Sequence, residues 1–255
     1  MLRLENLCTG YNGIERLHSL TADIRPGRLT AVIGPNGCGK STLLKCIAGI
    51  LPPSSGAMYL DGKRLSGLPG KDRAKHIAYM PQSRAVPEIT VRQLAAHGRY
   101  PHLKWGQKMR ASDHEIIESA LERTGMLPFA HRHVSRLSGG ERQKAYLAMM
   151  LAQQTPLMLL DEPTTYLDLS SQFELMELLR ALCREGRSVL TVLHDLPLAM
   201  EYADDLLLMQ DGCLIAAGSP ETLCASGKVG EVFNVRSRRL EDGKFVFSPF
   251  REVRR

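Results

Sequence analysis

Long uncharged apolar runs are missing from this sequence of 255 residues. None of its apolar stretches approaches the roughly 18 to 20 residues that a helix needs to cross a bilayer. Residues 1–7 mix charged side chains with apolar ones and lack the h-region of a signal peptide. These absences argue against a membrane-spanning chain and against an exported one, and we expect the chain to stay in the cytosol.

Cysteine pairs are missing as well. The six cysteines contain no C-x-x-C pair, and their spacing fits neither a zinc site nor a disulfide framework. The sequence has no internal repeat and no low-complexity tract. Its balance of 44% apolar and 24% charged residues is typical of a soluble globular protein. The net charge of +6 favours an anionic partner, which leaves nucleotide, nucleic acid and a membrane surface open.

Three continuous apolar runs predict strands that are covered on both faces, as in a parallel α/β sheet. The runs are residues 29–33, 157–160 and 189–193. Each leads directly into polar residues, namely a glycine-rich loop, the pair Asp161-Glu162 and the pair His194-Asp195. Because ligands bind at the carboxyl ends of parallel strands, we expect these polar groups to converge on one ligand.

Helical patterns follow the strands. Apolar spacing predicts a helix over 40–48 that ends at Gly49, and a second over 170–185 with Phe173 on its apolar face. Asp211-Gly212, between two apolar runs, predicts a β-hairpin.

Residues 86–152 differ from the rest of the chain, because they are rich in helix formers and contain no strong strand pattern. We therefore predict an α-helical subdomain at 86–152. It is inserted into an α/β nucleotide-binding core formed by residues 1–85 and 153–255.

A phosphate-binding loop of the pattern G-x-x-x-x-G-K-[ST] lies between the first predicted strand and its helix. Its backbone N–H groups and the helix N-terminus suit phosphate oxygens. Lys40 can reach the β- and γ-phosphates of ATP, and the Ser41 hydroxyl can ligate Mg²⁺. The predicted cofactors are therefore ATP and Mg²⁺. The nucleotide-binding residues are Gly34, Pro35, Asn36, Gly37, Cys38, Gly39, Lys40, Ser41 and Thr42.

Cys38 lies inside this loop, where the helix end and Lys40 would lower its thiol pKa and open a route to oxidative control. Of the two interpretations, we favour a tolerated small residue over a redox-active thiol.

The acidic pair supplies the chemistry that the loop lacks. Asp161 is predicted to hold Mg²⁺ through water, and Glu162 to orient or deprotonate the attacking water. His194 is predicted to hydrogen-bond the γ-phosphate and to fix the same water, with a structural histidine as the alternative. We count Lys40, Glu162 and His194 as catalytic candidates.

A second predicted phosphate-binding segment lies at residues 137–143, Leu-Ser-Gly-Gly-Glu-Arg-Gln, at the start of a predicted helix. Ser138, Gly139, Gly140 and Glu141 form a second anion-binding helix N-terminus. One nucleotide needs only one phosphate loop, so we expect this second segment to bind the nucleotide of a second copy of the chain. A symmetric homodimer with two shared nucleotides satisfies both surfaces.

These motifs, in this order, resemble the ATP-binding subunits of ABC transporters over nearly the whole chain. The resemblance implies a P-loop NTPase core, with a mostly parallel sheet, helices on both faces and N-terminal antiparallel strands. It adds Gln82 as a catalytic and Mg²⁺-sensing residue, and Tyr11 as the aromatic that stacks on adenine, for which a buried strand-end tyrosine is the alternative. Asp168 matches the loop that crosses to the other subunit. Glu141 departs from the commonest family pattern, which has glutamine there.

The resemblance also implies partners. They are a second copy of the chain, two membrane permease subunits and, indirectly, a solute-binding protein, with the chain peripheral on the cytoplasmic face of the inner membrane. Residues 98–103 and 162–168, which include Tyr166, are similar to segments of ferric-siderophore importers. Haem, vitamin B12 and other solutes stay open, as do exporters and amino-acid importers of the same family.

The rival class is a soluble ABC-type ATPase that acts on DNA or ribosomes. Such relatives carry long coiled coils or two ATPase units in one chain, and this sequence shows neither. We therefore expect no nucleic-acid partner.

Overall fold

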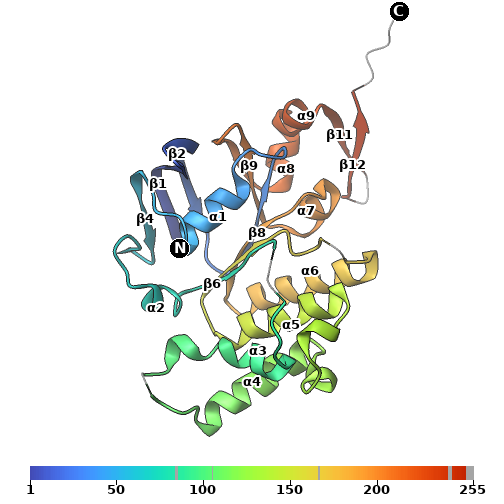
Figure 1. The fold of residues 1–255 in the computed structure, drawn as a ribbon. Coiled ribbons are helices and arrows are strands. Elements are labelled where there is room, and N and C mark those ends of the chain that lie inside the picture. The colour runs from blue at the N-terminus through green and yellow to red at the C-terminus, as the bar shows by residue number, and fades with distance from the viewer. Residues whose placement is uncertain (84–85, 105, 166, 241–242, 251–255) are drawn as a thin grey trace, which may run out of the picture.

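The computed structural model describes residues 1–83, 86–104, 106–165, 167–240 and 243–250. Tyr166, which belongs to the segment 162–168 that is similar to siderophore importers, lies outside these ranges. Two β-sheets and the helices between them form the upper part of the molecule in Figure 1, and a group of helices forms the lower part.

The central sheet has six strands in the order β10-β9-β3-β8-β7-β6. The parallel strands are β3 (Leu29–Ile33), β6 (Ile77–Met80), β7 (Leu157–Asp161), β8 (Ser188–Val192) and β9 (Asp205–Gln210). Strand β10 (Cys213–Gly218) pairs antiparallel with β9 through the turn Asp211-Gly212, which has positive φ at both residues. The predicted hairpin is confirmed, and every residue of β3 and β7 is buried, as continuous apolar runs predict.

A smaller antiparallel sheet precedes it, in the order β2-β1-β4-β5. Its strands are β1 (Leu2–Tyr11), β2 (Ile14–Ile24), β4 (Ser55–Leu60) and β5 (Lys63–Arg64). Asn12-Gly13 turns β1 into β2 with φ of 52° and 78°, the positive values that a two-residue hairpin turn requires. Helix α1 (Lys40–Ala48) contacts both sheets, and the buried leucines of all three share one core.

The predicted helix boundaries agree with the structure to within one residue. Helix α1 ends at Gly49, whose φ of 81° is a left-handed C-cap. Helix α6 spans Leu169–Arg184, and α7 spans Leu196–Tyr202. The placement of Phe173 on the buried face of α6 was wrong, because its side chain is 43% exposed and stacks with Tyr202 near the surface.

Helices occupy the chain between β6 and β7. They are α3 (Val91–His97), α4 (Ala111–Arg123) and α5 (Gly139–Ala152), joined by short 3-10 turns. In the described part of this stretch the only β pairing is an isolated bridge between Thr90 and His133. The three helices pack on one another and, as Figure 1 shows, lie away from the antiparallel sheet. The subdomain limits of 86 and 152 remain a prediction.

The remaining elements are peripheral. Helix α2 (Gly70–Arg73) follows β5. The last described elements are α8 (Pro220–Ala225), α9 (Lys228–Phe233) and the hairpin of β11 (Val235–Arg239) and β12 (Phe245–Pro249). The sequence assigns no firm role to residues 228–255. Among the described helices, none has the length and apolarity that crossing a bilayer demands.

A buried ion pair holds the helical segment together. Arg99 donates to the Asp113 carboxylate at 2.9 Å and to the Ala152 carbonyl at 2.8 Å, which joins the end of α3 to α4 and to the last turn of α5. Arg99 and Asp113 are each 6% exposed. A backbone N–H of Arg110 and then the Arg99 guanidinium lower the pKa of Asp113. Its stabilising contribution is therefore complete at neutral pH and is lost when acid lowers the pH through that depressed value.

Arg99→Ala leaves the Asp113 carboxylate and the Ala152 carbonyl buried without their partner. Breaking such a pair typically costs about 3–5 kcal/mol, and we expect a loss of that order in the free energy of unfolding measured in urea. Arg92→Ala is the matched control, because Arg92 also joins α3 to α4, through the more exposed Glu118. Equal losses in the two variants would contradict this account.

Candidate functional site

A pocket of about 860 Å³ opens at the carboxyl ends of β3, β7 and β8. The predicted convergence of three polar groups occurs here, since the phosphate loop, Glu162 and His194 all line it. The lining residues are Tyr11, Arg16, Asn36, Gly37, Gly39, Lys40, Ser41, Thr42, Gln82, Glu162 and His194. Gly34, Pro35 and Cys38 were predicted to bind nucleotide and do not belong to this lining.

The phosphate loop owes its path to glycines. Gly34 has φ of 152°, and a Cβ on it would lie 2.1 Å from the Met209 carbonyl oxygen. Gly39 has φ of 100°, and a Cβ on it would lie 2.7 Å from the Leu17 side chain. Only glycine meets both demands, and it allows the loop to pack closely against Leu17 of β2 and Met209 of β9.

Lys40 and Ser41 are held in place by the protein itself. The Lys40 ammonium donates to the carbonyls of Gly34 and Pro35 at 2.7 and 2.8 Å, and the residue is 5% exposed. Ser41 Oγ donates to Asp161 Oδ1 at 2.8 Å. A cation and a hydroxyl thus stand at the base of the pocket, where an anionic ligand would find both.

Asp161 lies behind Ser41 at the end of β7. It is 2% exposed, and burial raises the pKa of its carboxyl, while the bond from Ser41 opposes that rise. Tyr79 Oη lies 3.5 Å from the other carboxylate oxygen, and burial together with this carboxylate raises the pKa of the Tyr79 hydroxyl. Tyr79 therefore remains a donor to Asp161, a role that the sequence did not indicate.

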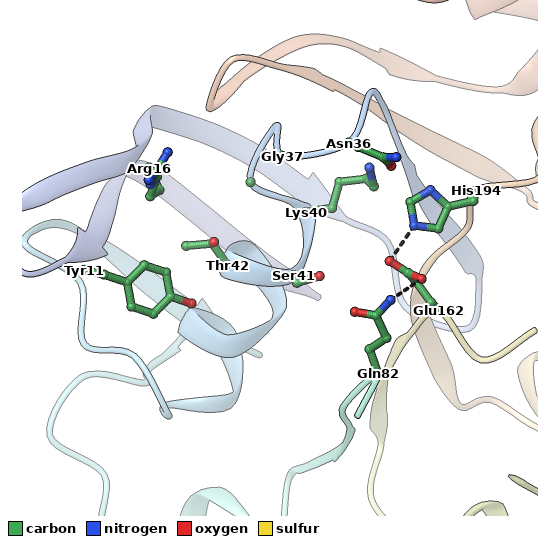
Figure 2. Close-up of a pocket in the computed structure, with 11 residues that line it drawn as sticks. Tyr11, Arg16, Asn36, Gly37, Lys40, Ser41, Thr42, Gln82, Glu162 and His194 are labelled. Atoms are coloured by element: carbon green, nitrogen blue, oxygen red, sulfur yellow. Dashed lines mark hydrogen bonds and ion pairs between the residues drawn. The ribbon is translucent and has the colours of Figure 1, made fainter. Parts of the chain in front are cut away.

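The Glu162 carboxylate is held by side chains that follow the two neighbouring strands, β6 and β8. Gln82 Nε2 donates to Glu162 Oε2 at 2.5 Å, and His194 Nε2 contacts Glu162 Oε1 (Figure 2). The backbone of Glu162 has φ of 51°, a left-handed conformation that is uncommon for a residue with a side chain. Such conformations gather at functional sites, because surrounding contacts must stabilise them.

Tyr11 stands at the opposite end of the pocket from Glu162 (Figure 2). It is 41% exposed, and the Lys45 ammonium lies 5.9 Å from its ring centroid. The alternative of a buried strand-end tyrosine was wrong, since the side chain is exposed and lines the pocket. Arg16 lines the pocket beside it and was missed, although the Asn12-Gly13 hairpin turn that brings it there is a readable signal.

The second predicted phosphate-binding segment, residues 137–143, does not line this pocket. Ser138 begins α5, and Ser138 and Glu141 form a capping box: the Ser138 N–H donates to Glu141 Oε2 at 2.8 Å and the Glu141 N–H to Ser138 Oγ at 3.3 Å. This explains an acidic residue at position 141. Asp168 caps α6 in a similar way, by accepting from the Ser171 N–H at 2.7 Å.

The proposal of a low thiol pKa at Cys38 was wrong. Cys38 is 4% exposed, and burial raises the pKa of its thiol more than the nearby Lys40 lowers it. The alternative of a small, packed residue is the one that the structure favours.

Comparisons with known proteins identify the family of this chain. The sequence profile of the ABC transporter family matches residues 17–165. The chain is 41% identical to the ferric enterobactin transport ATP-binding protein FepC of Escherichia coli (strain K12), over 94% of this chain and 90% of that protein. It is 42% identical to the probable siderophore transport system ATP-binding protein YusV of Bacillus subtilis (strain 168), over 94% and 88%.

A solved structure shares the fold. It is the dimeric structure of a post-hydrolysis state of an ATP-binding cassette bound to ADP and Pi, with a TM-score of 0.76 and 26% identity over 86% of this chain and 99% of that one. The profile match and the relatives together show that this chain belongs to the ABC transporter family, as one of its ATP-binding, ATP-hydrolysing subunits.

Proposed function

We propose that this chain energises the uptake of iron(III)-siderophore complexes, by hydrolysing ATP on the cytoplasmic face of the inner membrane beneath two permease subunits. The observation that supports ATP hydrolysis most directly is the position of Glu162. Gln82 and His194 hold its two carboxylate oxygens at the end of the pocket opposite Tyr11, beyond Lys40. An ATP molecule with adenine on Tyr11 and phosphates on the loop directs its γ-phosphate toward that carboxylate.

The donor set beside the loop fits Mg²⁺. Ser41 Oγ and the Asp161 carboxylate are hydrogen-bonded oxygens, and the Gln82 amide nitrogen is used by Glu162, which leaves its amide oxygen for other partners. Magnesium prefers oxygen ligands and keeps several waters. Ser41, Gln82 and, through water, Asp161 would hold the ion, which would neutralise charge on the phosphate oxygens.

In the proposed reaction Lys40 exchanges the two loop carbonyls for the β- and γ-phosphates. Glu162 accepts a proton from the attacking water, and His194 donates to the γ-phosphate. Both steps require Glu162 and His194 to leave their mutual contact.

The position of Ser138–Glu141 supports a shared site. These residues start α5 outside the pocket that holds the phosphate loop of their own chain, and the capping box uses the N–H groups of Ser138 and Glu141 but not those of Gly139 and Gly140. We propose that two copies pair head to tail, with this segment of each copy closing over the nucleotide of the other. Closure would move α3, α4 and α5 and the Gln82 loop, and these would transmit the motion to the permease.

The transported solute is inferred from the relatives, since both proteins named above carry siderophore transport in their names. The pocket itself accommodates ATP and carries no information about the solute.

Glu162→Gln removes the proposed base and keeps the side-chain size. We expect ATP hydrolysis to fall by about 100-fold or more, the lower range for general base catalysis. ATP binding should persist, so a stable ATP-bound dimer should accumulate on size-exclusion chromatography with light scattering. Normal turnover by this variant would remove Glu162 from its role.

Two inactive variants should complement each other if the site is shared. Lys40→Ala disables the loop, and Gly140→Asp places a negative charge in the opposing segment, where a Cβ meets only the Leu167 side chain at 3.4 Å. Random mixing makes half of the dimers mixed, each with one intact site of two, so ATPase activity should return to at most about a quarter of the wild-type value. Full activity of Gly140→Asp alone would contradict the shared site.

The solute is tested in the host organism. Deleting the gene should abolish uptake of radioactive iron supplied as a siderophore complex, and a plasmid carrying the wild-type gene, but not Glu162→Gln, should restore it. Unchanged iron uptake combined with loss of haem or vitamin B12 uptake would favour the alternative solutes. Neighbouring genes for a permease and a solute-binding protein would support import of either kind.

A further inference from the structure

Arg16 is a charged side chain of the pocket that the proposed mechanism does not use. It is exposed, it lines the pocket, and within the described ranges its guanidinium forms no hydrogen bond or ion pair. Its neighbour Glu15 faces elsewhere, toward His18 at 3.6 Å and Ser54 at 3.3 Å. The positive charge of Arg16 is therefore uncompensated by a carboxylate in a pocket that already contains Lys40.

The backbone of Arg16 is fixed against the phosphate loop. A Cβ on Gly39 would lie 3.0 Å from the Arg16 carbonyl oxygen, and a Cβ on Gly212 would lie 2.5 Å from the same atom. The next residue, Leu17, is fully buried, and the N–H of His18 donates to the Gly212 carbonyl at 3.0 Å. The root of the side chain is thus immobilised in the pocket wall, and only its tip is free to meet a ligand.

The order of residues along the pocket assigns Arg16 to one part of a nucleotide. Figure 2 shows Arg16 and Tyr11 at one side of the pocket. Thr42 lies next to this pair, and Lys40 lies farther along the pocket. Gln82, Glu162 and His194 lie at the opposite side. A nucleotide with adenine on Tyr11 and its last phosphate near Glu162 brings its α-phosphate past Thr42 and Arg16. A guanidinium matches phosphate oxygens with two parallel N–H donors.

We propose that Arg16 binds the α-phosphate of the nucleotide and thereby sets the affinity for ATP and ADP alike. This rests on the proposed function, because it takes the pocket to be the nucleotide site. The α-phosphate does not react during hydrolysis, so the interaction is the same in the ground state and the transition state. Such uniform binding changes KM and leaves kcat unaltered.

The test is isothermal titration calorimetry of the full chain with MgADP. Arg16→Gln should raise the Kd about 10-fold, as expected for loss of a charge-assisted hydrogen bond. Arg16→Lys keeps the positive charge but lacks the two parallel N–H donors of a guanidinium, so its Kd should lie between those of the wild type and Arg16→Gln. Arg64→Gln is the matched control, an exposed arginine of the same sheet outside the pocket, and should leave the Kd unchanged. In ATPase assays Arg16→Gln should raise KM by the same factor at constant kcat.

Three results would overturn the proposal. The first is an unchanged Kd for MgADP in Arg16→Gln and Arg16→Lys. The second is a loss that disappears when 2′-deoxy-ADP replaces ADP, which would place Arg16 on the ribose hydroxyl. The third is failure of the wild-type chain to bind MgADP, which would overturn the nucleotide site itself, whereas the first two leave that site intact.

Discussion

The parallel register of three adjacent strands places the reactive groups of this protein together. Met80 of β6 pairs with Leu160 of β7, and Asp161 of β7 pairs with Val192 of β8. Gln82 and Glu162 each follow their paired residue by two positions, and His194 follows Val192 by two. Because the strands are parallel and in register, the three side chains emerge at one edge and meet at a single carboxylate.

The polar groups of the site are paired with one another or with the backbone of the phosphate loop. Lys40 is satisfied by loop carbonyls, Ser41 by Asp161, and Glu162 by Gln82 and His194. Lys40 and Asp161 are buried and Glu162 is largely so, and these charged groups would be costly to leave unpaired. We propose that a nucleotide replaces these internal partners and that a second copy supplies Ser138–Glu141 to close the site.

Much of this was readable from the sequence, because the strands are continuous apolar runs and the phosphate loop requires a fixed spacing of glycines. Phe173 was misplaced because helical periodicity alone does not show where a neighbouring element ends. Tyr79 went unnoticed because it becomes a site residue only through tertiary contact, and Arg16 because the Asn12-Gly13 turn was not used to pair the two strands that it joins. The sequence could not exclude a lowered Cys38 pKa, because burial, which the sequence does not display, is what outweighs the charge of Lys40.

The central claim is that each nucleotide is enclosed by two chains. The most direct measurement is an experimental structure of the Glu162→Gln chain with MgATP bound. The account predicts a symmetric dimer in which Ser138 and the N–H groups of Gly139 and Gly140 of one copy contact the γ-phosphate held by Lys40 of the other. A nucleotide bound by Lys40 in a monomer, or in a dimer whose Ser138–Glu141 segments face solvent, would contradict it.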